Sequence, residues 1–137
     1  MDGLKKNAKA ALDARNLSYS PYSGFRVGAA LVCKDGQVYT GANIENASYS
    51  PTNCAERTAF FRAIMDGHQR DFSAIFIAGG ANEAPDNFCP PCGVCRQVMR
   101  EFCNPDEFSI FLVKSEDEVR EYKLCELLPL SFGPEDL

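Results

Sequence analysis

The sequence has 137 residues, which suits a single domain, residues 1–137, with one hydrophobic core. Hydrophobic residues make up 45% and charged residues 24%, an ordinary balance for a globular protein. The formal net charge is −5, and the sequence carries no basic stripe of the kind typical of polyanion-binding domains. Composition therefore argues against nucleic acid as a partner and favours a small, neutral ligand.

The N-terminal segment lacks the pattern of a secretory signal, because Lys5, Lys6, Lys9 and Arg15 interrupt any apolar run. No stretch of the sequence is long and apolar enough to cross a bilayer. We therefore expect a cytoplasmic protein that has no membrane partner.

A first helix is predicted over residues 4–15, where apolar positions recur at about 3.6-residue spacing and lysines occupy the opposite face. Residues 18–24 are rich in turn-forming side chains. A strand over residues 25–33 carries apolar or small residues on both faces, so we expect both faces to be covered. Lys34-Asp35-Gly36 forms a hairpin turn into a returning strand over residues 37–42.

A second helix is predicted over residues 54–65, which are rich in Ala, Glu and Arg, and Gly67 is placed to end it. A third strand over residues 73–78 precedes a long loop over residues 79–91. A third helix follows over residues 93–103. The side of this helix that we expect to be buried consists of Val94, Val98, Met99 and Phe102.

Two further strands are predicted over residues 108–113 and 119–124, followed by one helical turn over residues 126–128 and an irregular tail. Strand–helix–strand units favour parallel neighbours through right-handed crossovers, whereas the hairpin is antiparallel. The elements therefore predict an α/β fold with three layers, α-β-α, in which helices cover both faces of a mixed five-stranded sheet.

Seven cysteines are present, and an odd number in a reducing compartment argues against a disulfide framework. Cys92 and Cys95 have two residues between them at a predicted helix start, where both sulfurs can face one ion. Cys54 begins the other helix and would supply a third thiolate. Three thiolates and one water complete the tetrahedron of a catalytic zinc ion. We therefore predict one Zn²⁺ per chain, bound by these three cysteines.

Two charged residues follow Cys54 directly in the predicted helix. Glu56 can take a proton from zinc-bound water and return it elsewhere, as in metal-assisted hydrolysis. Its alternative role is the common one of a first-turn glutamate that complements the helix dipole. Arg57 would place a positive charge beside the thiolates, and its alternative is a solvated surface position. The neighbouring cysteines favour a role at the site for both residues.

A closed structural zinc site is the competing interpretation. Cys89 lies three residues before Cys92 and could join the predicted ligands as a fourth cysteine. However, Pro90-Pro91 keeps the chain extended between Cys89 and Cys92. A closed site would also have no bound water from which Glu56 could take a proton. The single histidine, His68, lies in a polar turn, is expected to be exposed to solvent, and is not predicted to be a ligand.

Over nearly its whole length the chain resembles the small, zinc-dependent cytidine deaminases that form homotetramers. Zinc deaminases of this kind carry a His-x-Glu or Cys-x-Glu segment and a later Pro-Cys-x-x-Cys. The segments that carry the resemblance are residues 21–25, 27–30, 43–47, 54–59, 91–98, 127–129 and 131–134. The resemblance implies hydrolytic deamination of cytidine and deoxycytidine to uridine and deoxyuridine, for pyrimidine salvage, in a homotetramer with active sites shared between subunits.

The resemblance also implies a role for individual residues. The predicted zinc ligands keep their role, and Glu56 becomes the proton shuttle. Asn43 and Glu45 would bind the ribose 3′-hydroxyl, and residues two apart on an extended segment do point the same way. Phe25 would pack against the pyrimidine, and Ala55 would bind the base through its backbone. The aromatic residues that would line a neighbouring subunit's site are Tyr49 and Phe132.

The sequence leaves three functions open. The first is deamination of free nucleosides, and the second is deamination of another aminopyrimidine, such as a nucleoside antibiotic. The third is a non-catalytic zinc module that binds protein or nucleic acid. Asn43 and Glu45 favour the plain nucleoside, and the acidic charge argues against nucleic acid.

Overall fold

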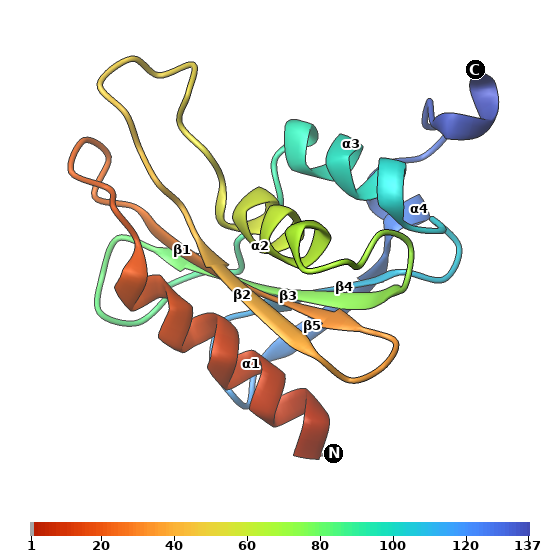
Figure 1. Cartoon of the computed structure of the whole chain (residues 1–137). Helices are drawn as coiled ribbons and strands as arrows, with labels where there is room; N and C mark the ends of the chain where they lie inside the picture. The colour runs from red at the N-terminus through yellow and green to blue at the C-terminus, as the bar shows by residue number, and fades with distance from the viewer. Residues whose placement is uncertain (1) are drawn as a thin grey trace.

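Helices cover both faces of a five-stranded sheet in the computed structural model of the chain, which describes residues 2–137 (Figure 1). Every predicted helix and strand is present, with bounds that shift by at most two residues. The elements are α1 (Asp2–Ala14), β1 (Arg26–Cys33), β2 (Val38–Ala42), α2 (Ala55–Met65), β3 (Phe72–Gly80), α3 (Gly93–Phe102), β4 (Ser109–Val113), β5 (Val119–Lys123) and α4 (Leu124–Leu127), with 3₁₀ turns at Arg15–Leu17 and Pro134–Asp136.

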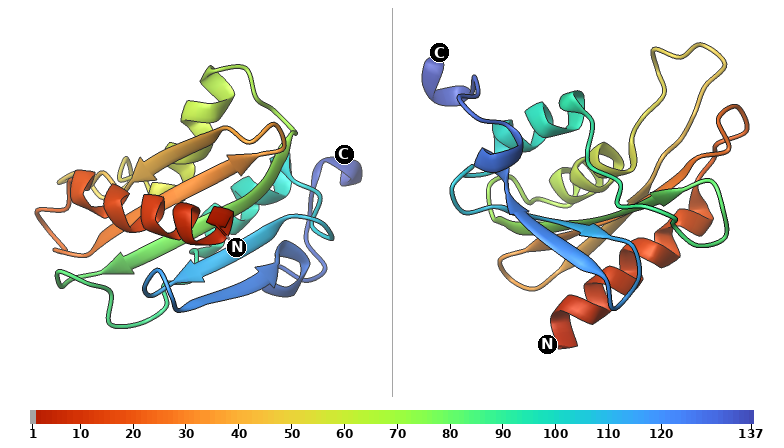
Figure 2. Two further views of the ribbon diagram at one scale, coloured as in Figure 1. Left: turned by 90° about the horizontal axis from the view of Figure 1, so that it is seen from below. Right: turned by 180° about the vertical axis from the view of Figure 1, so that it is seen from behind.

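The strands lie in the order β2-β1-β3-β4-β5. β3 and β4 are parallel and are joined through α3, whereas the other neighbouring pairs are antiparallel. α1 lies on one face of the sheet, and α2 and α3 lie on the other (Figures 1 and 2). The predicted three-layer α/β fold with a mixed sheet is therefore confirmed. None of the helices formed by residues 2–137 has the length and hydropathy needed to cross a bilayer.

Alternation along β1 divides the hydrophobic core into two parts. Ala29 and Leu31 belong to the larger cluster, beneath α2 and α3, whereas Ala30 packs in the smaller cluster with Ala8 and Ala11 of α1. Side chains on successive residues of a strand point to opposite faces. The central strand is therefore covered on both sides, as its sequence predicted.

Two glycines allow helices to lie directly against the sheet. A Cβ atom on Gly28 would lie 2.1 Å from the carbonyl oxygen of Ala11 in α1. A Cβ atom on Gly41 would lie 2.4 Å from the carbonyl oxygen of Ala55 and 2.5 Å from the amide nitrogen of Ala59, both in α2. Any side chain at Gly41 would therefore move α2 away from β2.

Arg15 fixes the loop that leads from β3 to α3. Its buried guanidinium donates hydrogen bonds to four carbonyl oxygens, those of Arg26 (3.1 Å), Gly80 (2.8 Å), Asn82 (2.7 Å) and Glu83 (3.1 Å). A buried carbonyl group that loses its hydrogen-bond donor lowers the stability of the folded protein. One side chain at the end of α1 therefore holds the start of β1 and the end of β3 together.

Two expectations about burial are wrong. Val94 was expected on the buried side of α3 but is 57% exposed. The inward positions of α3 are occupied by Cys95, Met99 and Arg100. Cys95 faces other cysteines, and Arg100 is covered by the C-terminal tail, where it pairs with Glu135.

His68 was expected to be exposed, but its side chain is only 11% exposed. It packs between the rings of Tyr39 and Phe72.

Gly41→Ala is expected to destabilise the protein by about 1–3 kcal/mol, the usual cost of overpacking, because the new methyl group would overlap the backbone of α2. Gly3→Ala is the matched control, since a Cβ atom at Gly3 meets nothing within 4 Å. Urea denaturation of both variants measures the difference. Equal free energies of unfolding for the two variants would show that α2 does not rest on β2 in this way.

Candidate active site

Three cysteine sulfurs converge where α2 and α3 begin. Cys54 and Cys92 are the N-cap residues of the two helices, and Cys95 lies in the first turn of α3. The Sγ atoms of Cys54 and Cys92 are 3.8 Å apart, and those of Cys92 and Cys95 are 3.5 Å apart. All three sulfurs lie within 4.8 Å of one another. The structure therefore brings together the three cysteines that we predicted as zinc ligands from the sequence.

The spacing of these sulfurs fits a zinc ion. Thiolates that bind a tetrahedral zinc ion at about 2.3 Å lie about 3.8 Å apart. Cys95 is buried, whereas Cys92 is exposed, so the cluster is open to solvent on one side. A catalytic zinc ion needs such an open position for water or substrate.

Two sources of positive charge lie beside the Cys54 sulfur. Nη2 of Arg57 donates to this sulfur at 3.3 Å, and the helix start adds the partial charge of its free N–H groups. The pKa of Cys54 is lowered to about 5, first by a hydrogen bond with Cys95 and then by Arg57. The pKa of Cys95 is raised in turn, chiefly by that hydrogen bond and by burial. The Arg57 guanidinium therefore lies where it favours the thiolate form of Cys54.

Glu56 lies in the first turn of α2, beside the cluster, and is 5% exposed. Burial raises the pKa of its carboxyl to about 7, and the negative charge of Cys54 adds to the effect. A carboxyl group with a pKa near neutral pH can both accept and donate protons under the same conditions. This environment suits proton transfer and not a simple helix-dipole contact on the surface.

Cys89 lies outside the cluster. Among the described residues, the group of cysteine sulfurs within 4.8 Å of one another contains Cys54, Cys92 and Cys95, without Cys89. Cys89 instead packs over Gly79, and burial raises the pKa of its thiol to about 11. This arrangement gives no support to a closed four-cysteine site.

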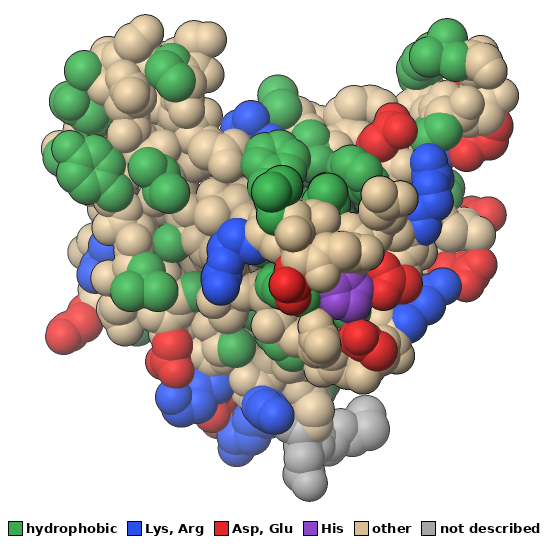
Figure 3. Space-filling model, in the orientation of Figure 1, with side chains coloured by type: hydrophobic (Ala, Val, Ile, Leu, Met, Phe, Trp, Pro, Cys, Tyr) green, Lys and Arg blue, Asp and Glu red, His purple; other side chains and the backbone are tan. Residues whose placement is uncertain are grey.

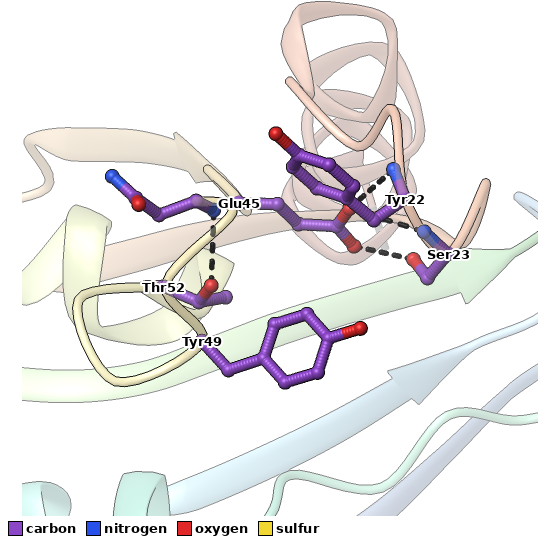
Figure 4. Close-up of a pocket in the computed structure, with 6 residues that line it drawn as sticks. Tyr22, Ser23, Glu45, Tyr49 and Thr52 are labelled. Atoms are coloured by element: carbon purple, nitrogen blue, oxygen red, sulfur yellow. Dashed lines mark hydrogen bonds between the residues drawn. The ribbon is translucent and has the colours of Figure 1, made fainter.

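A pocket of about 300 Å³ surrounds the carboxylate of Glu45 (Figure 4). The carboxylate accepts hydrogen bonds from the backbone N–H groups of Tyr22 (3.0 Å) and Ser23 (3.1 Å) and from the Ser23 hydroxyl. These bonds, that of the hydroxyl above all, lower the pKa of Glu45. The residues that line this pocket are Tyr22, Ser23, Glu45, Asn46, Tyr49 and Thr52. The cysteine cluster and Glu56 do not line it.

Asn43 has a structural role that the sequence did not indicate. Its Oδ1 atom accepts hydrogen bonds from the Val27 N–H (2.9 Å) and the Ser18 hydroxyl (2.5 Å), and its Nδ2 atom donates to the Phe25 carbonyl oxygen (2.8 Å). An amide nitrogen carries two hydrogens. One N–H of the Asn43 side chain is therefore left for a ligand, while the rest of the amide fixes Phe25.

The other predicted site residues lie in different places. Phe25 is partly exposed and lies beside Cys89 above Gly79. Ala55 is the buried first residue of α2, where a backbone N–H has no acceptor within the helix. Tyr49 is 79% exposed and lines the pocket around Glu45 in its own chain.

Phe132 lies on the C-terminal tail, where its carbonyl oxygen accepts a hydrogen bond from Gln97 Nε2 at 2.9 Å. This tail and the loop over residues 43–53 leave the body on opposite sides of α2 and α3 (Figures 1 and 2). The structure thus brings Tyr49, but not Phe132, next to Glu45. Ser23 is a contact that sequence reasoning missed, since residues 18–24 indicated a turn and the resemblance over residues 21–25 gave Ser23 no role.

Known proteins match this chain in sequence. A family model described as the cytidine and deoxycytidylate deaminase zinc-binding region matches residues 1–111. The cytidine deaminase of Halalkalibacterium halodurans is 49% identical over 129 residues, 94% of this chain and 93% of the relative. That of Sporosarcina psychrophila is 48% identical over 124 residues, 90% of this chain and 87% of the relative.

Solved structures match the fold as well. The crystal structure of cytidine deaminase from Burkholderia pseudomallei has a TM-score of 0.84 and 44% identity, and the match covers 93% of this chain and 97% of the other. That of Mycobacterium tuberculosis has a TM-score of 0.78 and 36% identity, with 93% and 95% covered. Because the family model, the relatives and the cysteine geometry agree, this chain belongs to the family of zinc-binding cytidine deaminases.

Proposed function

We propose that the chain hydrolyses cytidine and deoxycytidine to uridine and deoxyuridine, with release of ammonia, as an enzyme of pyrimidine salvage. Membership in the family supports cytidine as a substrate. The observation that carries the chemistry is the buried Glu56 beside three cysteines at two helix starts. We assign one catalytic domain to residues 1–137, and a cytoplasmic location stays a prediction.

Glu56 moves the protons of the proposed reaction. Zinc bound by Cys54, Cys92 and Cys95, one ion per chain, supplies an activated water molecule when it is present. The Glu56 carboxylate accepts a proton from this water and delivers it to the ring nitrogen next to the amino-bearing carbon. The remaining hydroxide adds to that carbon, Glu56 carries the proton of the new hydroxyl group to the amino group, and the carbon–nitrogen bond breaks to release ammonia. A pKa near 7 suits a group that alternates between acid and base.

Asn43 and Glu45 are the proposed partners of the sugar. The Glu45 carboxylate is held by Ser23 and the Tyr22 backbone, so it can accept a hydrogen bond from the ribose 3′-hydroxyl without further ordering. The free N–H of Asn43 can donate to the same hydroxyl. Phe25 would pack on the pyrimidine and the Ala55 backbone would bind it. These contacts favour the plain nucleoside over an antibiotic with a different sugar.

We also propose a homotetramer in which subunits share active sites. Hydrophobic side chains gather on the outer face of α2 and α3 in Figure 3. The exposed apolar residues of these helices are Phe61, Met65 and Val94. Tyr49 and Phe132 are exposed on segments that project from the body. A subunit packed on this face would cover these side chains, and gel filtration tests the assembly.

Glu56→Gln should keep its zinc but lose deaminase activity by about 10²–10⁴-fold, because an amide cannot transfer the protons. The fall in ultraviolet absorbance of cytidine and deoxycytidine measures turnover, and metal analysis measures zinc. An antibiotic analogue run in parallel tests the alternative substrate. Near-normal turnover by the variant would remove Glu56 from the mechanism.

Cys92→Ala should lose its zinc, because two thiolates remain of the three. Cys89→Ala is the matched control and should retain one zinc ion per chain, since Cys89 lies outside the cluster. Zinc content after extensive dialysis separates the two. Loss of zinc from Cys89→Ala would instead support the closed four-cysteine site.

Ser23→Ala should raise the KM for cytidine by about 3–10-fold with little change in kcat, because it removes the hydroxyl that orders Glu45. Ser50→Ala, an exposed serine on the neighbouring loop, is the control. The same pair is measured with 3′-deoxycytidine, which lacks the hydroxyl that Glu45 would bind. An equal effect of Ser23→Ala on both substrates would contradict the sugar contact.

A further inference from the structure

A second group of metal-ligating side chains lies at the other end of α2. Cys33 ends β1, Asp35 lies in the hairpin turn, and His68 follows Gly67 after α2. One ligand atom from each, the Cys33 sulfur, an Asp35 carboxylate oxygen and a His68 ring nitrogen, lie within 4.8 Å of one another. The group therefore joins two turns that are separated by more than thirty residues of sequence.

Asp71 orients the histidine in the way that carboxylates do in metal sites. Oδ2 of Asp71 lies 2.5 Å from Nδ1 of His68, which leaves Nε2 to face the other ligands. Metal-binding histidines usually donate their second ring N–H to a carboxylate or carbonyl, which fixes the ring and raises its basicity. The contact between His68 and Asp71 has this geometry.

Oxygen atoms face both ring nitrogens of His68. Nε2 lies 3.1 Å from Oε1 of Gln37 and 3.9 Å from Oδ2 of Asp35, while Nδ1 faces Asp71. A neutral imidazole donates from one nitrogen only. A neutral His68 ring that donates from Nδ1 to Asp71 therefore leaves Nε2 with a free lone pair, which can bind a metal ion.

The site is rigid on one side and open on the other. Cys33 is buried, and the His68 ring packs edge-on against Tyr39 with 5.4 Å between centroids. The Asp35 side chain is half exposed, so an ion can enter from solvent. Asp66, hydrogen-bonded to Tyr39, adds negative charge nearby. In Figure 3 the surface coloured as histidine borders surfaces coloured as acidic side chains.

We propose that Cys33, Asp35 and His68 form a second metal site that binds a divalent transition-metal ion such as Zn²⁺, with Asp71 as the orienting carboxylate. A thiolate, an imidazole and a carboxylate together favour zinc and related ions over Mg²⁺ or Ca²⁺, which prefer oxygen ligands alone. Binding releases the Cys33 thiol proton to solvent. The bound ion links the β1–β2 hairpin to the turn after α2, away from the cysteines of the proposed reaction.

The chain's single histidine makes the site selectively observable. The Cys54, Cys92 and Cys95 cluster contains no imidazole, so a change at the histidine ring reports the second site alone. Zn²⁺ is titrated into the zinc-loaded protein while the ring-proton signals of His68 are followed by NMR. We expect a saturable shift with one further ion per chain and release of protons into weakly buffered solution.

Asp35→Asn and Cys33→Ser should each weaken this binding at least tenfold. Asp35→Asn is the safer variant, since its side-chain oxygen can still accept the N–H of Gln37, and the residue is exposed. Asp117→Asn, in an exposed turn elsewhere, is the control and should bind as the parent chain does. Deaminase activity should be unchanged in Asp35→Asn, which separates this site from the proposed function.

Two results would overturn the proposal. One is an absence of any His68 shift with Zn²⁺ in excess. The other is a shift that persists in both Asp35→Asn and Cys33→Ser. The first result would leave His68 as a partner of Asp71 in this turn, and the second would show that zinc reaches His68 without Cys33 or Asp35 as ligands.

Discussion

The direction of β1 is the constraint on which the site depends. β1 is antiparallel to both of its neighbours, so β2 and β3 run the same way and end at the same edge of the sheet. α2 and α3 follow these two strands and therefore both begin at that edge. The two helix N-termini can meet there because β2 and β3 run in the same direction. The cysteines that start each helix are brought together by this topology and not by their distance in sequence.

The meeting of two helix N-termini also offsets the negative charge of the three thiolates. Three thiolates around one ion would carry a net negative charge, which makes bound water harder to ionise. Two helix N-termini and Arg57 supply positive charge on the protein side of the cluster. Burial raises the pKa of Glu56 to about 7, so near neutral pH its carboxyl group carries a negative charge for only part of the time. The proposed ligands, the proposed proton carrier and the compensating charge all come from two helix starts.

Most of the fold could be predicted because its signals are local. Alternation along residues 25–33 and helical periodicity in residues 4–15 are properties of neighbouring residues, and both led to correct elements. The clustering of the three cysteines could be predicted for a similar reason, since Cys92 and Cys95 form a short motif at a helix start.

What the sequence could not predict depends on contacts between distant segments. Val94 is exposed because Cys95 and the tail-bound Arg100 occupy the inward positions of α3. The burial of His68 depends on Tyr39 and Phe72 lying beside it. The bonds of Asn43 to β1 exist only once the chain has folded back on itself.

The hydrogen bonds of Arg15 have a consequence for anyone who redesigns the ends of this protein. Arginine carries five N–H donors and lysine only three, so a lysine at this position could not donate all four of these hydrogen bonds. Arg15, in the 3₁₀ turn after α1, therefore connects this end of the helix to the loop that precedes Cys92. A shortened N-terminus that removes Arg15 would change the structure of the sheet edge where α2 and α3 begin, although it deletes no residue there.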